Sequence, residues 1–369
     1  MSTTKKIGVG VIGASPVNPG WAMVAHIPAI QALPEFELRA VSTSRPDTAR
    51  AAAEALGVKA FYSAADLINH DGVDLVVVAV KAPLHKALIM SALEARRAVF
   101  SEWPLASNLA DAQQLVSYAH ERKVRTFIGM QARYSPVLAR AGGLIAQGYI
   151  GGVLATTLVG SAMAWGAKTD AAHAYMFDQA NGASTLSVSA LHALDAMQCV
   201  LGPLKNVAAI TAVGRATIEI VDEKRRIAAT APDHISLSGV LASGAVASVH
   251  YRGGTSRAGN LRWEINGTDG DLLITSTNGN LQVADLKLEG GRGDAETLSA
   301  VPVPAHMANL PETLRTGMGA NVAREYMAIA RDMADDTHFV PDFSYALSRH
   351  RLLAQIEESA RLGVNVRLI

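Results

Sequence analysis

The sequence predicts an α/β protein in which a parallel sheet with helices on both faces is followed by a second domain built on a mostly antiparallel sheet. From residue 5 to about 129, short apolar runs alternate with helical stretches, a pattern typical of parallel strands joined by crossover helices. After Tyr134 the apolar and polar residues alternate over longer stretches, separated by turn signals such as Asn278-Gly279. The 369 residues, 49% of them hydrophobic, are enough for two domains.

The N-terminal domain is expected to span residues 1–129. Its predicted strands are Ile7 to Ile12, Phe36 to Ser42, Leu75 to Val80, Ala98 to Phe100 and Thr126 to Ile128. Its predicted crossover helices are Asp47 to Leu56, His85 to Ala95 and Leu109 to Lys123. A sheet of this type binds ligands at the carboxyl ends of its strands.

The second domain is expected to span residues 130–369. Its clearest predicted strands are His234 to Val240, Ala245 to Arg252, Leu261 to Ile265 and Asp271 to Thr275. A helix is expected from about Ser344 to Leu362, because apolar residues recur on one face and Gly363 can cap its C-terminus.

Composition excludes several classes of function. Lys plus Arg and Asp plus Glu are equal at 33 each, so the chain has no electrostatic signature for nucleic acid or for an anionic membrane. The apolar run Ile7 to Gly13 is too short to span a membrane. Cys199 is the one cysteine of the chain, which fits a reducing compartment, and the cytoplasm is the expected location.

The first strand is followed by the loop Gly13-Ala-Ser-Pro-Val-Asn-Pro-Gly20 and then by a helical stretch. Backbone N–H groups at such a turn favour an anion, and small residues let a diphosphate approach the chain closely. Ser15 replaces the usual second glycine and the loop is longer than Gly-x-Gly-x-x-Gly. An ordinary turn is therefore the alternative, but the position at the first strand-to-helix turn favours a dinucleotide.

The end of the second strand bears on the choice of cofactor. A carboxylate at this place binds the ribose hydroxyls of NAD. Here the chain has Thr43, Ser44 and Arg45, whose hydroxyls and guanidinium suit a ribose 2′-phosphate. NADP is therefore favoured over NAD, unless Arg45 is only a solvated loop residue.

Several motifs together carry a family resemblance. They are the glycine loop with Gly20-Trp21-Ala22, Glu102-Trp103-Pro104, Gly129-Met-Gln131-Ala-Arg133, Ile145-Ala-Gln-Gly-Tyr-Ile-Gly151 and Ile265-Asn-Gly-Thr-Asp-Gly270. With these motifs the chain resembles the glucose-fructose oxidoreductase/inositol dehydrogenase (Gfo/Idh/MocA) family, and most of all the branch of the yeast galactose-regulon repressor. The similarity extends over nearly the whole chain.

The resemblance implies a Rossmann dinucleotide-binding domain and an α+β domain with a large, open-faced sheet. In the family that face is often used in oligomers, which implies a homodimer or homotetramer here. The positions that match the family's dinucleotide site are Gly13, Ser15, Gly20, Trp21, Thr43, Ser44, Arg45, Val80, His85, Glu102, Trp103 and Gln131. His26 also matches a recurrent family position, where a packing or capping role is expected.

The catalytic positions of the family are only partly retained. Trp103 stands where a reactive lysine is usual, and Val188 stands where an aspartate is usual, whereas His192 and Asp195 match. An indole only donates a hydrogen bond, while an imidazole titrates near neutral pH, so His192 is the candidate acid/base. Asp195, three residues later, either orients His192 or simply pairs with it. A structural histidine bonded to a neighbouring carboxylate is the alternative.

The segment before the His192 helix contains candidate substrate-binding residues. Trp165, Lys168 and Tyr175, together with His192, offer aromatic faces and polar groups suited to a carbohydrate-like ligand. Each of the first three can equally be a surface loop residue. No set of His, Cys, Asp and Glu in the sequence has convincing spacing for a metal site.

Three functions remain open. The favoured one is an NAD(P)-dependent oxidoreductase that acts on a sugar, a cyclic polyol or a related small carbonyl or alcohol. The second is a catalytically silent regulatory protein that senses NAD(P) and binds a partner protein. The third is a redox-neutral enzyme that uses its bound nucleotide transiently.

Overall fold

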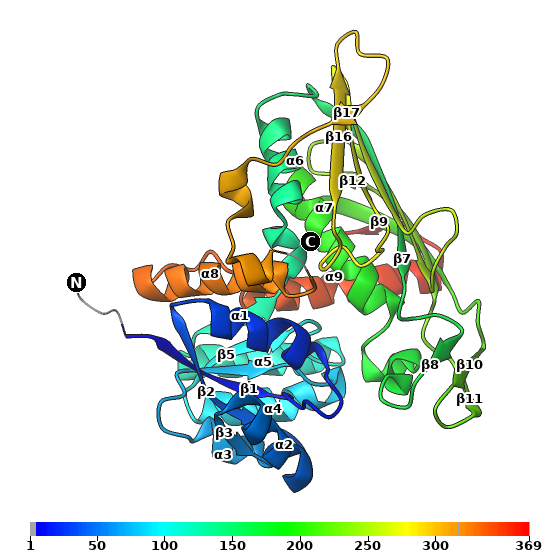
Figure 1. Cartoon of the computed structure of the whole chain (residues 1–369). Coiled ribbons are helices and arrows are strands. Elements are labelled where there is room, and N and C mark those ends of the chain that lie inside the picture. The colour runs from blue at the N-terminus through cyan, green and yellow to red at the C-terminus, as the bar shows by residue number, and fades with distance from the viewer. Residues whose placement is uncertain (1–4, 316, 369) are drawn as a thin grey trace. The chain divides into compact units, whose positions relative to one another are not determined.

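The computed structural model describes residues 5–315 and 317–368. The chain divides into two compact units (Figure 1). The first consists of residues up to Gln131 together with Asn309–His350, and the second consists of Ala132–Ala308 together with the residues from Arg351 onward. The expected boundary at residue 129 lies close to the first break, but residues 309–350 return to the first unit.

The first unit contains a parallel sheet of six strands. Its strands in spatial order are β3 (Lys59–Phe61), β2 (Phe36–Ser42), β1 (Ile7–Ile12), β4 (Leu75–Val78), β5 (Ala98–Glu102) and β6 (Thr126–Gly129). This order is that of the Rossmann fold, in which the direction of winding reverses between β1 and β4. The ligand-binding edge of the sheet is therefore formed by the carboxyl ends of its strands.

Amphipathic helices cover this sheet. They are α1 (Ile27–Ala32), α2 (Pro46–Leu56), α3 (Ala64–Ile68), α4 (His85–Glu94) and α5 (Leu109–Arg122), with α8 (Ala320–Asp335) added from the returning segment. A π-helical turn, Ala22–His26, precedes α1 directly. Buried residues of β1, α1 and α8 belong to a single apolar cluster, among them Val9, Ile30, Tyr326 and Ile329. Burial of this apolar face holds α8 in the first unit.

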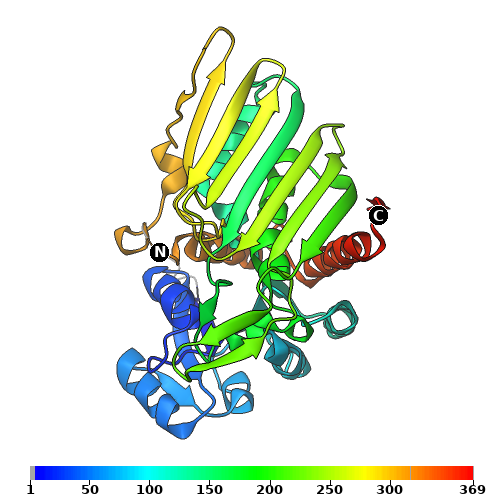
Figure 2. The same ribbon diagram turned by 90° about the vertical axis from the view of Figure 1, so that its right-hand side faces the viewer.

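The second unit is built on a mixed sheet of nine strands, most of them antiparallel, which lie side by side in Figure 2. In spatial order they are β17 (Ser299–Ala300), β16 (Lys287–Arg292), β15 (Gly270–Ser276), β14 (Leu261–Gly267), β7 (Val153–Ala162), β13 (Val246–Gly253), β12 (His234–Leu241), β9 (Leu204–Ala212) and β18 (Val366–Arg367). Among the described strands of this sheet, β7 and β13 are the one parallel pair.

Helices α6 (Pro136–Ala146) and α7 (Leu191–Leu201) also belong to the second unit, where α7 continues a π-helical segment, Thr185–Ala190. The C-terminal helix α9 (Phe343–Leu362) contributes its residues up to His350 to the first unit and the rest to the second. A smaller sheet joins β8 (Lys168–Thr169), β10 (Thr217–Ile220) and β11 (Arg225–Ala228). Within the described ranges, no helix has the length and apolar character needed to cross a membrane.

The predicted fold class is confirmed, and most predicted elements lie within two residues of the observed ones. The short edge strand β3 was not predicted, because its three residues carry no periodic pattern. Gly363 ends α9 with a φ of 67°, as expected of a C-terminal cap.

Candidate functional site

The glycine loop begins in a backbone conformation that requires glycine. Gly13 has a φ of 103°, and a Cβ on it would lie 2.6 Å from the carbonyl oxygen of Ala79. The turn after β1 therefore passes directly against the end of β4. This contact joins the two strands between which the sheet reverses its winding, where a dinucleotide binds in this fold.

The rest of the loop is open. Residues 17–20 are exposed, and a Cβ on Gly20 would meet no atom within 4 Å. In the described part of the chain, no side chain caps the helical turn that starts after Trp21, and the buried Nε1 of Trp21 has no hydrogen-bond partner there. The N–H groups of Met23 and Val24 donate to the carbonyl oxygen of Gly20, so the indole N–H of Trp21 is the donor that fits an anionic ligand with acceptor oxygens, such as a diphosphate.

The first turn of α2, directly after this loop, contains a carboxylate that the pattern Thr43-Ser44-Arg45 does not reveal. The Arg45 guanidinium donates to both carboxylate oxygens of Asp47, over 3.0 and 3.1 Å. This exposed guanidinium holds the pKa of Asp47 below its usual range, mainly through the hydrogen bond. The site therefore presents a paired guanidinium and carboxylate rather than a free cation.

His85 links the ends of two neighbouring strands. Its Nδ1 lies 2.8 Å from the carbonyl oxygen of Pro104, after β5, and its Nε2 lies 3.0 Å from that of Val80, after β4. Burial lowers the pKa of His85, which favours the neutral ring. Because a neutral ring has one N–H, it donates to one carbonyl at a time. His85 therefore fixes the shape of this edge.

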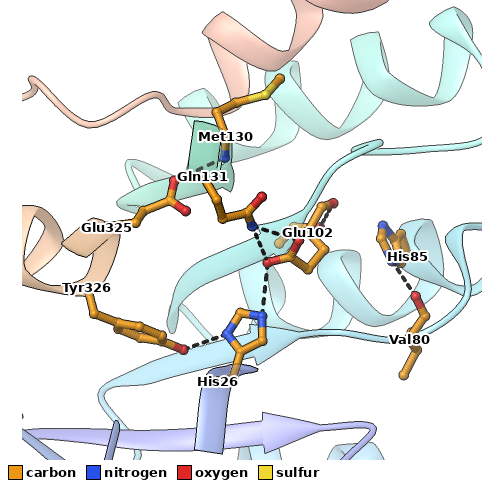
Figure 3. Close-up of polar contacts among 9 residues, drawn as sticks. His26, Val80, His85, Glu102, Met130, Gln131, Glu325 and Tyr326 are labelled. Atoms are coloured by element: carbon orange, nitrogen blue, oxygen red, sulfur yellow. Dashed lines mark hydrogen bonds and ion pairs between the residues drawn. The ribbon is translucent and has the colours of Figure 1, made fainter. Parts of the chain in front are cut away.

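Glu102, the last residue of β5, is the centre of a polar network (Figure 3). The amide nitrogen of Gln131 donates to both Glu102 carboxylate oxygens over 2.9 Å. The Nε2 atom of His26 lies 2.9 Å from Glu102 Oε1, and Nδ1 of the same ring lies 2.9 Å from the hydroxyl of Tyr326. Two segments far apart in sequence thus converge on one carboxylate, and His26 connects a third, through Tyr326, to the same network.

The direction of these hydrogen bonds follows from the chemistry of the groups. A carboxylate only accepts, so Nε2 of His26 carries the proton that is donated to Glu102. Burial, together with the charges of Glu102 and Glu325, raises the pKa of Tyr326 well above its usual value, so its hydroxyl stays protonated. In a neutral ring Nδ1 then accepts from that hydroxyl. His26 is fully buried, so its role is internal to the network.

Gly129 leaves room for this arrangement. A Cβ at that position would lie 2.5 Å from the amide nitrogen of Gln131 and 2.7 Å from Oε1 of Glu102. On the next residue, the Met130 N–H donates to the buried carboxylate of Glu325 over 3.1 Å. The end of β6 is thus fixed on both sides, and Gln131 is directed at Glu102.

Trp103 is buried, with an exposed fraction of 4%, and its ring packs against His350 with centroids 4.6 Å apart. Burial lowers the pKa of His350 to about 4, so the ring is neutral at physiological pH. The aromatic side chain thus has a packing partner within its own unit, at the motif position where a lysine is usual.

In the second unit, Asp195 pairs with Arg133. The guanidinium donates two hydrogen bonds to the Asp195 carboxylate, of 2.7 and 3.0 Å, and the Asp195 side chain is 1% exposed. The sequence did not predict this salt bridge between Asp195 and the arginine of the Gln131-Ala-Arg133 motif. Both oxygens of Asp195 are engaged by this pair, which ties α7 to the segment before α6.

His192 is buried on the first turn of α7, with an exposed fraction of 3%. Trp165 is also buried and donates its indole N–H to the carbonyl oxygen of Met176 over 3.3 Å. Tyr175 and Val188 pack against the same apolar cluster as Trp165, and burial raises the pKa of Tyr175. Lys168 is exposed and forms an ion pair of 3.2 Å with Glu219.

The structure therefore brings some of the predicted site residues together and separates others. Gly13, Val80, His85, Glu102, Trp103 and Gln131 all lie at the carboxyl edge of the parallel sheet. In the second unit Trp165, Tyr175 and Val188 share an apolar cluster, whereas Lys168 is directed to Glu219. The sequence did not single out Tyr326, the contact of His350 with Trp103 or the pairing role of Arg133. Their partners are 62 to 300 residues away or on other elements, so no local pattern could reveal them.

Two family models match the chain. Residues 7–130 match the oxidoreductase family with an NAD-binding Rossmann fold (Gfo/Idh/MocA). Residues 136–276 match the C-terminal domain of Gal80p. The two matches cover most of each unit and meet near the change of unit at Gln131.

Similar proteins include both enzymes and regulators. Dehydrogenase aclE of Aspergillus oryzae is 29% identical over 98% of both chains. The galactose/lactose metabolism regulatory protein GAL80 of Saccharomyces cerevisiae is 29% identical over 76% of this chain and 69% of its own. The crystal structure of a super-repressor mutant of Gal80p from Saccharomyces cerevisiae superposes with a TM-score of 0.87, at 25% identity and 98% coverage of both chains.

Proposed function

Because the chain belongs to the Gfo/Idh/MocA family of oxidoreductases with an NAD-binding Rossmann fold, we propose that it is an NAD(P)-dependent oxidoreductase of a sugar, polyol or related small carbonyl or alcohol. The observation that carries the proposal lies at the carboxyl edge of the parallel sheet. There the turn at Gly13 passes close to the end of β4, and Gln131 donates a hydrogen bond to Glu102. The similarity to a dehydrogenase over 98% of both chains supports the choice of an enzyme.

Residues of the first unit would hold the nucleotide. The loop from Gly13 to Gly20 and the indole N–H of Trp21 suit the diphosphate. Thr43, Ser44 and Arg45 suit the adenosine ribose, and Arg45 would favour NADP if it were released from Asp47. Glu102 and Gln131 suit the nicotinamide half. When bound, the nicotinamide supplies the acceptor or donor of hydride.

His192 is our candidate acid/base. As hydride leaves an alcohol, an imidazole can accept the hydroxyl proton, and in the reverse direction it can supply a proton to a carbonyl oxygen. Arg133 holds both oxygens of Asp195, so we assign Asp195 to the support of α7 rather than to proton transfer. Trp165 and Tyr175 support the same region by packing, and Lys168 at the surface is the remaining polar candidate for substrate contact.

The test is to identify any nucleotide that co-purifies and to follow its redox state with a panel of aldoses, inositols and ketosugars. We expect turnover with some member of the panel, and a loss of about a hundred- to ten-thousand-fold in rate for His192→Ala. His120→Ala, which removes an exposed histidine, is the matched control. An inert panel with nucleotide demonstrably bound would count against an oxidoreductase.

A regulatory protein is the second candidate, supported by the Gal80p-like second unit and by Trp103 packed against His350 in place of a lysine. In this case tight nucleotide binding would change the affinity for a partner protein without any change in the redox state of the nucleotide. The same nucleotide analysis, combined with a pull-down in the presence and absence of NAD(P), separates the two candidates.

We also propose a homodimer or homotetramer formed through the outer face of the nine-stranded sheet. Ile210 and Val246 are 72% and 56% exposed on strands of that sheet, and Val240 is paired with Val246. Ile210→Asp combined with Val246→Asp is expected to reduce the mass measured by light scattering to that of a monomer.

A reducing compartment such as the cytoplasm remains the expected location, since Cys199 is the one cysteine of the chain and cannot form a disulfide within it.

A further inference from the structure

We propose that the outer face of the nine-stranded sheet binds a second copy of this chain about a two-fold axis parallel to β7, so that the acidic edge of each sheet meets the basic edge of the other. This inference rests on the proposed oligomer and adds to it the direction of the axis and the groups that select it. Three features of the second unit carry it: the alignment of residues across the sheet, the charge of its two halves, and a hollow at its acidic edge.

The centre of the outer face is lined by small side chains (Figure 2). Thr157 of β7, Ser248 of β13 and Ser238 of β12 are aligned by the strand register, and all three are exposed. Ile210 and Val246 add apolar side chains that are also exposed. Nine strands at a spacing of about 4.8 Å, over about 20 Å of strand length, present about 800 Å² per copy, which is the area that each partner buries in a stable interface.

One row of aligned residues crosses almost the whole sheet on this face. Its members, from β15 to β18, are Asp271, Asn266, Ala155, Val246, Val240, Asn206 and Arg367. Paired residues on neighbouring strands lie on the same side of a sheet. Asp271 and the exposed Arg367 therefore belong to the same face, toward opposite edges of the sheet.

The two halves of the sheet differ in charge. On one side of β7, the described strands β9, β12, β13 and β18 carry three cations, Lys205, Arg252 and Arg367, and no carboxylate. On the other side, residues 261–300 contain β14 to β17 and carry seven carboxylates against three cations. The central strand β7 contains no charged residue. The sheet is thus basic toward β18 and acidic toward β17.

A hollow of about 790 Å³ lies at the acidic edge, between the outer face of β14 and β15 and the loop 293–298. Two arginines and five carboxylates line it, and the carboxylates are those of Glu264, Asp269, Asp271, Asp294 and Glu296. Arg262 pairs with Glu264, and the guanidinium of Arg292 lies 5.4 Å from the centre of the Tyr149 ring. The excess of carboxylates makes the hollow suited to a cationic side chain.

This distribution of charge selects one of two symmetric arrangements. When two copies of a sheet pack face to face, the two-fold axis between them runs either parallel to the strands or across them. An axis across the strands would place each acidic edge against the other acidic edge, which is repulsive.

An axis parallel to β7 exchanges the two edges and preserves the row. Since β7 is the fifth of nine strands, β17 of one copy then lies over β18 of the other, about 19 Å from the axis. Arg367 of the second copy faces the loop that carries Asp294 and Glu296. The symmetry repeats the same contact at the other edge, so each dimer contains two such contacts.

Charge reversal tests the contact by sedimentation velocity. We expect Arg367→Glu to raise the dissociation constant of the sheet-face contact by about ten- to a hundred-fold, because each change occurs twice in the dimer. The pair Asp294→Lys and Glu296→Lys should have a similar effect. All three changes together should restore most of the affinity, since the charges are then exchanged. Arg226→Glu is the matched control, because it reverses an exposed charge on β11, outside this sheet.

Disulfide trapping tests the direction of the axis in a Cys199→Ser background, which removes the exposed thiol. Positions 296 and 367 lie at opposite edges of one sheet, about 38 Å apart, so a disulfide between them can only join two copies. Glu296→Cys combined with Arg367→Cys should form a cross-linked dimer under oxidising conditions. Either cysteine alone should not, whereas an axis across the strands would bring identical positions together. Circular dichroism confirms that each variant is folded.

The outcomes separate this inference from the proposed oligomer. If Ile210→Asp with Val246→Asp dissociates the wild-type oligomer but the charge reversals leave its dissociation constant unchanged, the axis is overturned and the sheet-face oligomer stands. A cross-link in either single-cysteine variant also overturns the axis. If the wild type is a monomer, or associates independently of Ile210 and Val246, both are overturned. Weakening by each charge reversal, recovery in the combined variant and a cross-link only in the paired-cysteine variant support the inference.

Discussion

Arg133 forms a two-point salt bridge with Asp195, and the carboxylate of this pair is almost fully buried. The sequence directs attention instead to the spacing of His192 and Asp195 on α7. Because both oxygens of Asp195 are held by Arg133, this aspartate supports the helix that bears His192. Loss of the Arg133–Asp195 pair is therefore expected to lower the free energy of unfolding.

Arg133→Met is expected to lower the free energy of unfolding by about 3–5 kcal/mol, because it leaves the buried Asp195 carboxylate without its partner. Arg39→Met, which removes an exposed ion pair with Glu37, is the control and should cost at most about 1 kcal/mol. Urea unfolding followed by circular dichroism measures both. Equal losses in the two variants would contradict the structural role of the buried pair.

Trp103→Lys tests whether the motif position tolerates its more usual residue. The buried indole packs against His350, so a lysine there would lose ring contacts and bury an ammonium group. We expect a loss of about 3–5 kcal/mol in stability, as for other large truncations in a core. Trp103→Phe should cost less. A Lys variant as stable as the wild type would show that the side chain at this position reaches solvent.

His350 predicts a dependence of stability on pH. Its pKa in the folded protein is about 4, below the value of about 6.5 for an unperturbed histidine. Between these two pKa values the unfolded chain binds more protons at His350 than the folded chain does. The contribution of the neutral, buried His350 to the free energy of unfolding is therefore complete above about pH 6.5 and is lost as the pH falls toward 4. His350→Phe keeps an aromatic ring and should flatten this part of the curve. Urea midpoints measured across the range provide the test, and an unchanged slope would refute it.

Asp47 is predicted to restrain the affinity for NADP. Asp47→Asn removes the carboxylate that pairs with Arg45, which leaves the guanidinium available to a 2′-phosphate. We expect NADPH to gain about three- to ten-fold in affinity relative to NADH. The double variant with Arg45→Gln should lose this gain. If Asp47→Asn alters both affinities equally, Arg45 does not contact the phosphate.

The sequence was sufficient for the fold because its main elements are defined locally. The strand β1 has the predicted bounds Ile7–Ile12, and α9 begins one residue before the predicted Ser344. Apolar periodicity and turn residues determine such elements, and both can be read within a short window. The sequence did not predict that the helix α8 belongs to the first unit. Its packing there depends on contacts with residues about 300 positions earlier in the chain, which no short window contains.

The site was predictable to the extent that the family motifs define it. Those motifs include Glu102 and Gln131, and the structure joins these two residues by hydrogen bonds. The hydrogen bond from the Tyr326 hydroxyl to His26 connects two helices of the fold, so only tertiary structure reveals it. The pairing of Arg45 with Asp47 lies within three residues, but the choice of partner depends on the conformation of the loop.

The missing side chain at Gly129 has a consequence for natural variation. A Cβ at this position would occupy the space that Gln131 and Glu102 need in order to meet, so these three positions are expected to change together. In related chains a larger residue at the position of Gly129 should accompany the loss of the acidic or the amide side chain. An alignment of such chains would then separate those with an intact polar network from those that have abandoned it, without reference to any catalytic residue.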